Sequence, residues 1–312
     1  MADSLPERSK VPAMRFGFTL PNNWGVEDPH EVLRLAATAE QAGFDSVWVN
    51  HHILNVGYVA DRLGERPYHD ALTILTWAAA VTKRVRLGTS VLVLPYLHPM
   101  VLAKTLATLD VLSGGRVIAG VGVGSLPEEN AALSVDYLRR GLYTDESIQV
   151  MKALWTQPEA VFAGEFFNLD GIKASPKPLQ RPHLPIVVGG NRPPALRRVA
   201  RLADGWHPLG LAPQSMASRL ERIDQELAVV GRDRSELQIS VRLDISIRAN
   251  GDSAPEGAPP LHGTVDQIVA AVEAYRAVGV GEVVVSLSSA DIDRQHAVLE
   301  TLAQEVLPRT KG

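Results

Sequence analysis

Short runs of β-branched and other apolar residues alternate with longer amphipathic segments along nearly the whole chain. Over 30–42, for example, Val32, Leu35, Ala36 and Ala39 recur at the spacing of one helix face, and Gly43 follows where a helix would end. The pattern predicts strands over 14–20, 46–50, 85–94, 116–124, 185–190, 205–209, 237–247 and 282–288. It predicts helices over 30–42, 70–81, 100–112, 136–155, 193–202, 213–230, 264–278 and 291–306.

These eight strand–helix units follow one another without an intervening hairpin. The order predicts a parallel sheet, because parallel strands need crossover connections. Eight units fit a closed (β/α)8 TIM barrel better than an open sheet, which would carry a G-x-G-x-x-G turn where 21–25 read PNNWG. We therefore expect an α/β protein with one barrel domain over 14–312, an insertion segment around 157–183, and a disordered N-terminal tail over 1–13.

The composition limits the partners and the chemistry. The chain has 312 residues, with 31 Lys and Arg against 35 Asp and Glu, and a net charge of −4 is too small to predict a nucleic-acid or anionic-membrane surface. The absence of cysteine excludes disulfides, thiolate metal sites and a cysteine nucleophile. No apolar run approaches the roughly 18–20 residues that span a bilayer, and the first residues lack the apolar stretch of a signal peptide. We expect a cytoplasmic protein without a nucleic-acid or membrane partner.

The barrel prediction also places the candidate site, because catalytic residues in this fold lie at the C-terminal ends of the strands. We apply this rule to each predicted strand and take the residues at its end, which apart from Val91 are polar, aromatic or glycine. They are Asn22, Trp24, Asn50, His51, His52, Ser90, Val91, Gly122, Gly124, Ser125, Glu128, Gly189, Gly190, Asn191, Trp206, His207, Asp244, Ser286 and Ser288.

The segment 185–200, PIVVGGNRPPALRRVA, combines a buried strand with the start of a helix. The strand passes through Gly189 and Gly190 into a first helical turn that carries Pro193 and Pro194. Glycines let a backbone approach a ligand closely, and the first amides of a helix favour an anion. The segment is therefore either a phosphate cradle or a tight strand-to-helix turn, and the residues alone do not separate the two.

Two histidines follow the second predicted strand. His51 and His52 are adjacent, so on an extended chain only one of them can face the barrel mouth. That residue would act as a hydrogen-bond donor or as a general acid or base, or it would merely cap a loop. A metal site would combine the pair with His69 and Asp244, although no H-x-H or carboxylate spacing supports it.

Two further patterns concern glycines and large apolar residues. The glycines of GVGVGS over 120–125 fit beside a planar ligand, or they relieve crowding at the barrel rim. A series of large apolar residues is expected to form part of the core: Trp77, Leu109, Leu112, Leu154 and Trp155.

Four segments together resemble the bacterial luciferase-like family of flavin- and deazaflavin-dependent oxidoreductases. They are GFDSVWVNHH (43–52), the run from RVRLGTSV to GVGVG (84–124), PIVVGGNRPPALRRVARLADGW (185–206) and GTVDQIVAAVEAYRAVGVGEVVVSL (263–287). The resemblance runs from Met14 to about Leu307. Within the family, the chain is most similar to the branch that uses the deazaflavin coenzyme F420.

The resemblance implies roles for the matching residues. His52 matches a histidine that lies over the reactive part of the cofactor ring, and Ser90–Val91 falls where F420-binding members carry a non-proline cis peptide against the ring. The 189–191 backbone matches the part that holds the cofactor phosphate. We expect the cofactor to be bound by Asn50, His52, Ser90, Val91, Gly122, Gly124, Glu128, Gly189, Gly190 and Asn191, with His52 as the catalytic residue.

This chain departs from the family pattern at two positions. His51 stands where many relatives have an acidic residue, which leaves the hydrogen bonding of His52 open. Ser125 stands where relatives often have a large aromatic residue or an acid. The acid used by some sugar-phosphate dehydrogenases of the family is absent, so the resemblance implies no sugar-phosphate substrate.

From the resemblance we expect an oxidoreductase that transfers a hydride between F420 and a small organic substrate, with Trp24 and Trp206 on the substrate side, and a homodimer. The main alternative is an FMN-dependent luciferase-like monooxygenase of the same fold. A metal-dependent TIM-barrel hydrolase and a non-catalytic flavin-binding relative are further alternatives.

Overall fold

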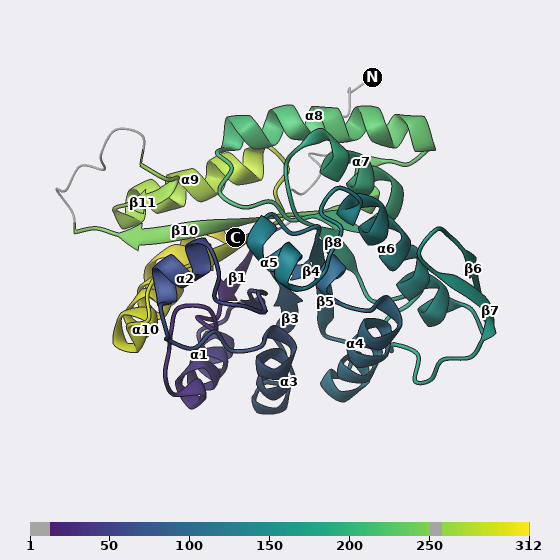
Figure 1. The fold of residues 1–312 in the computed structure, drawn as a ribbon. Helices are drawn as coiled ribbons and strands as arrows, with labels where there is room; N and C mark the ends of the chain where they lie inside the picture. Colours follow the sequence, from purple (N-terminus) through teal and green to yellow (C-terminus); the bar gives the residue numbers. More distant parts are fainter. Residues whose placement is uncertain (1–12, 250–257, 312) are drawn as a thin grey trace, which may run out of the picture.

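The computed structural model describes residues 13–249 and 258–311, and its parallel strands close into a barrel (Figure 1). Around the ring each strand pairs with the next and the last pairs with the first. The strands in this order are β1 (Arg15–Thr19), β2 (Ser46–Val49), β3 (Arg86–Thr89) with its continuation β4 (Leu92–Val93), β5 (Val117–Gly122), β8 (Ile186–Val188), β9 (Gly205–Trp206), β10 (Gln238–Ile247) and β12 (Glu282–Ser286). The predicted (β/α)8 barrel is confirmed.

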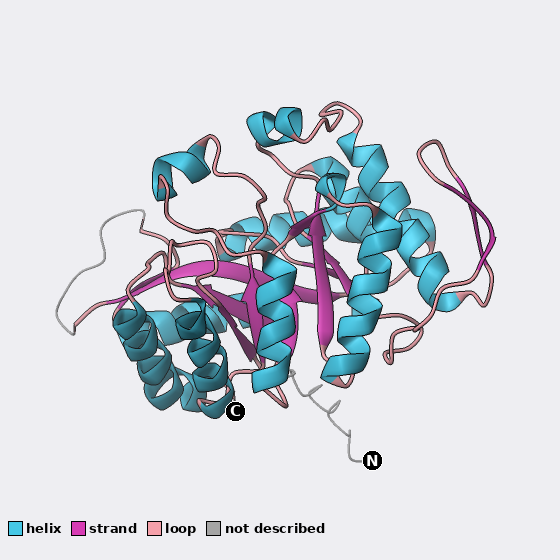
Figure 2. Ribbon diagram, turned by 60° about the horizontal axis from the view of Figure 1, so that its bottom comes forward, coloured by secondary structure: helices cyan, strands magenta, loops and turns pink. Residues whose placement is uncertain are grey.

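Helices surround the strands (Figure 2). Those that follow the barrel strands are α1 (Pro29–Gln41), α3 (Ala71–Val81), α4 (Pro99–Ser113), α6 (Arg140–Thr156), α7 (Pro193–Leu202), α8 (Pro213–Val230), α9 (Val265–Ala277) and α10 (Ile292–Thr301), which continues through η3 (Leu302–Val306) into α11 (Leu307–Thr310). Smaller elements are η1 (Leu94–Tyr96), η2 (Arg234–Glu236) and β11 (Leu261–Gly263), which extends the edge of β10. None of the helices in the described part of the chain has the length and apolar character needed to cross a bilayer.

Helix α1 shows how local sequence sets the helix ends. The Asp28 carboxylate accepts a hydrogen bond from the backbone N–H of His30 at 2.9 Å, and Pro29 occupies the first helical position. Gly43, at φ 86°, follows the last turn in a backbone conformation that suits glycine. The apolar face predicted from the sequence is buried against the barrel.

The insertion segment differs from its prediction. It contains an antiparallel pair of strands, β6 (Ala160–Ala163) and β7 (Asn168–Ile172), so the expectation of no hairpin is wrong here. The pair projects at the right-hand side of Figures 1 and 2. Glu146 on α6 holds its tip, because its carboxylate accepts hydrogen bonds from the backbone N–H groups of Glu165 and Phe166, both at 2.8 Å. The predicted tail falls outside the described residues, apart from residue 13.

An aromatic pair fills the barrel interior. The Trp48 indole stacks on the His207 ring with centroids 4.5 Å apart and planes 5° from parallel. Gly17 and Gly88 make room for it, since a Cβ at Gly17 would lie 2.7 Å from Trp48 Nε1 and one at Gly88 would overlap the ring. His207 also contacts Ser90, which follows β3, and so links the pair to the barrel mouth.

The expected core series is only partly correct. Leu109, Leu154 and Trp155 are buried, but Trp77 is 37% exposed and Leu112 is 70% exposed. Both exposed residues lie on the outer surface of α3 and α4. Apolar residues on these helices are so frequent that their number does not distinguish the core-facing side from the outer side.

Candidate active site

Two short helices lie beside each other over the C-terminal ends of the barrel strands (Figure 1). They are α2 (Tyr58–Leu63) and α5 (Pro127–Ala132). Val59 and Leu63 of α2 form a small apolar cluster with Leu126 at the start of α5, separate from the main core. Neither helix was predicted, because six residues are too few for a clear helical period. Together they bring new polar residues to the barrel mouth.

His52 is held by a buried carboxylate from α5. Its Nδ1 lies 2.6 Å from Oε2 of Glu129, whose side chain is fully buried. The other carboxylate oxygen accepts the backbone N–H groups of Ile53 (2.6 Å) and Leu54 (3.0 Å). Burial by itself would raise the pKa of Glu129, but the hydrogen bonds from His52 and from these amides outweigh it and lower that pKa. Both carboxylate oxygens of Glu129 therefore act as hydrogen-bond acceptors.

The second ring nitrogen of His52 is also engaged. The Tyr58 hydroxyl lies 2.7 Å from His52 Nε2, and the two rings meet edge to face at 88°. Burial raises the pKa of Tyr58, while Arg62 and Arg242 act in the opposite direction. Tyr58 is consequently a neutral phenol at neutral pH. It is half exposed, unlike the residues behind it.

Glu129 and Tyr58 were missed by the sequence analysis, which selected Glu128. The structure places Glu128 in an exposed position on α5, with no hydrogen bond from its side chain to another described residue. Adjacent helical residues point in different directions, so only the packing of α5 decides which glutamate reaches the histidine. The acid missing beside His52 at position 51 is thus replaced by Glu129, 77 positions away in the sequence.

His51 faces away from this cluster. It is buried, and its Nδ1 accepts the backbone N–H of Val93 at 3.2 Å. Burial lowers the pKa of His51 to about 4, so it is neutral at physiological pH. Of the two adjacent histidines, His51 supports the loop and His52 is at the mouth.

Asn50 joins the loops that follow the first two strands. Its backbone N–H donates to Asn22 Oδ1 at 3.0 Å, and Asn22 Nδ2 donates back to the Asn50 carbonyl at 2.9 Å. The Asn50 side-chain amide donates to Asn23 at 3.1 Å, and its oxygen accepts from Arg242 Nη1. Asn50 therefore lies at the mouth but has its side chain engaged within the protein.

Arg242 was not selected from the sequence, yet its guanidinium contacts Asn50 and Ser90, which follow two of the barrel strands. It projects from β10, and its Nη1 donates to the Ser90 carbonyl at 2.9 Å and to Ser90 Oγ at 3.3 Å. Burial lowers the pKa of Arg242. Its Nε is buried and has no hydrogen-bond partner among the described residues. A buried donor without a partner fits a site that a ligand acceptor atom completes.

His207 supports Ser90 from below. Its Nε2 lies 2.9 Å from Ser90 Oγ and its Nδ1 lies 2.7 Å from Ser240 Oγ. Burial, together with nearby Arg242, lowers the pKa of His207 to about 3. This neutral histidine orients Ser90.

Val91 lies between two glycine backbones. The Ser90–Val91 peptide bond is cis, as the resemblance implies, and it interrupts the predicted strand between β3 and β4. A Cβ added at Gly189 would lie 3.2 Å from both Val91 methyl carbons, and one at Gly122 would lie 2.8 Å from a Val91 methyl. Stretches 90–91 and 189–190, a hundred positions apart, thus meet on one rim and form a floor of backbone and a single valine.

Gly124 is favoured both by its backbone conformation and by the close approach of neighbouring side chains. Its φ is 73°, and a Cβ there would lie 2.7 Å from a Val93 methyl and 3.3 Å from the Tyr96 hydroxyl. Its carbonyl accepts a hydrogen bond from Arg140 Nε at 3.1 Å. The glycines at 122 and 124 therefore relieve crowding at the rim, and Gly122 does so next to the Val91 floor.

The 189–191 turn leads into α7 with open amides. The Gly189 N–H donates to the Val121 carbonyl at 2.9 Å. By contrast, the backbone N–H groups of Gly190, Asn191 and Arg192 donate to no other described residue. Free amides at the start of a helix are the feature that binds phosphate groups. Gly190, Asn191 and Arg192 therefore offer open amides to an anion, as the phosphate-cradle interpretation requires.

The expectation that Trp206 shapes the substrate side is corrected. Trp206 is completely buried in the core outside the barrel, since neighbouring strand residues face opposite sides and His207 takes the inner one. Its indole N–H donates to the Gly190 carbonyl at 2.8 Å. Trp206 therefore supports the 189–191 turn. Trp24 is partly exposed, and the Arg62 guanidinium lies 4.5 Å from its ring centroid.

The residues proposed for a metal site do not converge. Among the described residues, no group of three His, Asp or Glu side chains has the geometry of a metal site. His69 Nε2 contacts the Val26 carbonyl at 2.7 Å, and Asp244 accepts from Ser288 at 2.6 Å. The arrangement therefore gives the metal-dependent hydrolase no support.

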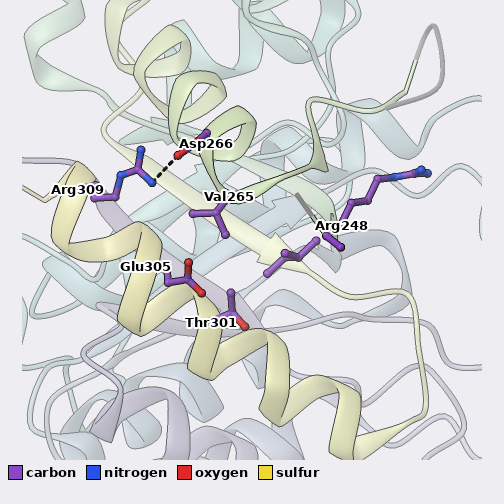
Figure 3. Close-up of a pocket in the computed structure, with 8 residues that line it drawn as sticks. Arg248, Val265, Asp266, Thr301, Glu305 and Arg309 are labelled. Carbon is purple, nitrogen blue, oxygen red and sulfur yellow. Dashed lines mark ion pairs between the residues drawn. The ribbon is translucent and has the colours of Figure 1, made fainter. Parts of the chain in front are cut away.

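A separate pocket of about 250 Å³ lies between the end of β10, α9 and the C-terminal helix (Figure 3). Its charged lining is partly neutralised, because Arg309 and Asp266 form an ion pair at 2.8 Å. None of the predicted site residues lines this pocket. It is not part of the candidate active site.

Comparison with known proteins identifies the family. The model of the luciferase-like monooxygenase family matches residues 14–284. The chain belongs to this family. Its members include oxidoreductases that use F420 or a flavin, so the expected family and the expected oxidoreductase class are confirmed.

Individual relatives include users of F420 and a monooxygenase. An F420-dependent glucose-6-phosphate dehydrogenase of Kineococcus radiotolerans is 31% identical over 248 residues, which are 77% of this chain and 71% of the relative. The crystal structure of a monooxygenase from Streptomyces bottropensis has a TM-score of 0.80 at 25% identity and covers 95% of this chain and 99% of its own. An F420-dependent secondary alcohol dehydrogenase has a TM-score of 0.81 at 20% identity, over 96% of this chain and 100% of its own, which supports the fold.

Proposed function

We propose that this protein transfers a hydride between the deazaflavin coenzyme F420 and a small organic substrate. The observation that carries the proposal is the meeting of Val91 with Gly189 on one rim, next to the open amides of Gly190 and Asn191. A flat cofactor ring with an anionic tail needs such a floor and such donors side by side. The F420-dependent relative named above supports the choice of cofactor.

The residues fit this cofactor. The amides of Gly190 and Asn191 would hold its phosphate, and the N-terminal end of α7 would favour the negative charge. Val91 would support the ring, and the unpartnered Nε of Arg242 would donate to an acceptor on the bound molecules. When bound, F420 supplies a carbon centre that accepts or gives up a hydride.

The protein residues then orient the substrate and control its proton. His52, fixed by Glu129, would stabilise charge that develops on the substrate during hydride transfer. Helix α2 and the partly exposed Trp24 would shape the substrate side of the mouth and exclude water.

Titration of the purified apoprotein with F420 and with FMN tests the proposal. We expect saturable F420 binding that changes the absorbance of the deazaflavin, and weaker FMN binding. Binding of FMN alone, with oxygen consumption when reduced FMN is supplied, would instead establish the monooxygenase alternative, which the Streptomyces relative supports. If neither cofactor binds, the proposal is wrong.

A further inference from the structure

We propose that Tyr58 is the residue that exchanges a proton with the substrate, and that His52 and Glu129 form the relay behind it. The inference rests on the proposed hydride transfer and deepens it, because it assigns the proton step to a residue that the family resemblance does not mark. It also limits the substrate to a class in which a proton moves together with the hydride.

The hydrogen bonding of His52 is the first reason. Its Nδ1 contacts Glu129 at 2.6 Å and its Nε2 contacts the Tyr58 hydroxyl at 2.7 Å. An imidazole ring has only these two nitrogens for hydrogen bonding. A substrate could reach His52 directly only by displacing Tyr58, whereas it can reach the Tyr58 oxygen without breaking the chain.

The direction of the hydrogen bonds follows from the carboxylate. Glu129 accepts two backbone N–H groups on one oxygen, so it is ionised and accepts from His52 Nδ1 on the other. In the proposed relay the proton on His52 Nδ1 faces Glu129, and Nε2 accepts from Tyr58. The raised pKa of Tyr58 keeps its hydroxyl protonated for this purpose.

Exposure increases outward along the chain of three side chains. The Glu129 side chain is 0% exposed, the His52 side chain is 16% exposed, and Tyr58 is 49% exposed. Of the three, Tyr58 is therefore the most accessible from solvent. Tyr68 also lies against the His52 ring, with centroids 5.9 Å apart, but it has no hydrogen bond to either nitrogen.

The chemistry balances for a hydroxyl–carbonyl pair. The substrate C–H bond breaks and its electron pair leaves with the hydride to the oxidised deazaflavin. The hydroxyl proton passes to the Tyr58 oxygen while the Tyr58 proton passes to His52 Nε2, and the carbon–oxygen bond becomes double. His52 ends as an imidazolium beside the Glu129 carboxylate, which stabilises the charge. In reverse, the same relay supplies one proton for carbonyl reduction.

Nitrogen NMR of the apoprotein, labelled with ¹⁵N-histidine, tests the hydrogen-bond chain without any cofactor. We expect a proton on His52 Nδ1 and an Nε2 signal shifted by an accepted hydrogen bond. Tyr58→Phe should move the Nε2 signal to the position of an acceptor without a donor, and Glu129→Gln should remove the preference for Nδ1–H. Tyr68→Phe is the matched control, since it removes a hydroxyl near the same ring and should leave both signals in place.

Steady-state kinetics with a secondary alcohol and F420 test the proton step. Tyr58→Phe should lower kcat about 100-fold, as expected for loss of general acid–base catalysis, while the dissociation constant of F420 is unchanged. Adding Glu129→Gln to Tyr58→Phe should reduce kcat little further, because residues of one relay act as a unit.

The outcomes separate the two proposals. If wild-type protein does not bind F420, the proposed function fails. If F420 binds and turnover is normal in Tyr58→Phe, or if the Nε2 signal of that variant is unchanged, the relay is wrong and the function stands.

Discussion

Val91 lies against Gly189, and a Cβ at that glycine would come within 3.2 Å of both valine methyl carbons. The contact joins the loop after β3 to the loop after β8 and so defines the floor of the candidate site. A side chain at position 189 would displace the valine or the turn that carries the open amides.

We therefore expect Gly189→Ala to weaken F420 binding by about tenfold, equivalent to about 1.4 kcal/mol. Replacing Val91 by Ala in the same protein should restore part of the affinity, because it removes the two methyl groups. Gly281→Ala is the control, since its added Cβ would meet nothing closer than 3.7 Å. Isothermal titration of the three variants measures the effect, and equal affinities would contradict the proposed floor.

Trp206→Phe removes the indole N–H that donates to the Gly190 carbonyl. We expect a lower F420 affinity, because the turn with the open amides loses a support, and a loss of about 1 kcal/mol in the free energy of unfolding. Trp155→Phe is a matched control that loses an equivalent indole bond, to Ala103 at 3.0 Å, outside the site. It should lose similar stability with unchanged affinity. An equal effect of both variants on affinity would argue against this role of Trp206.

The two glutamates of α5 provide a direct comparison of sequence and structure. Glu129→Gln should lower kcat about tenfold or more, because it removes the buried carboxylate that holds His52 Nδ1. Glu128→Gln, at an exposed position, should have a much smaller effect in the same assay. The reverse order would support the assignment of Glu128 made from the sequence.

Stability should depend on pH through the buried histidines. The pKa is lowered to about 3 for His207 and to about 4 for His51, whereas an unfolded histidine titrates near 6.5. Between these pH values the unfolded chain binds more protons than the folded one, so stability that is complete above about pH 6.5 is lost as the pH falls. Urea unfolding at pH 8, 6 and 5 measures this slope. His207→Gln should make it shallower, and an unchanged slope would exclude His207 as a source.

The outer surface of α3 and α4 exposes large apolar residues, and these are where we expect the homodimer interface. Trp77, Val81 and Leu112 are exposed there, and monomers rarely leave large apolar patches uncovered. We expect a dimer by light scattering, and a monomer for Leu112→Glu. Val229→Glu, which changes a valine that is 73% exposed on α8, should remain dimeric. A monomeric wild type would refute the proposal.

The sequence predicted the barrel well because the signals involved are local. Helix faces repeat every three to four residues, and glycine or proline marks the ends, as at Pro29 and Gly43 of α1. The order of strand and helix then limits the topology, since parallel strands require crossovers. The position of His52 at a strand end follows from the same argument.

The orientation of individual side chains was less accessible to prediction. Strand residues buried on both sides are apolar on both faces, so the pattern could not show that Trp206 faces outward and His207 inward. Short helices give too little periodicity, which is why Tyr58 and Glu129 were missed.

The amino-acid sequence by itself thus determined the succession of elements, the barrel and the strand ends where a site must lie. Only the tertiary structure decided which groups meet there: Glu129 with His52 across 77 positions, and Arg242 with Asn50 across 192. The physical reason is that periodicity and turn chemistry act between near neighbours in the chain. Hydrogen bonds at the barrel mouth instead depend on the register and packing of the closed fold.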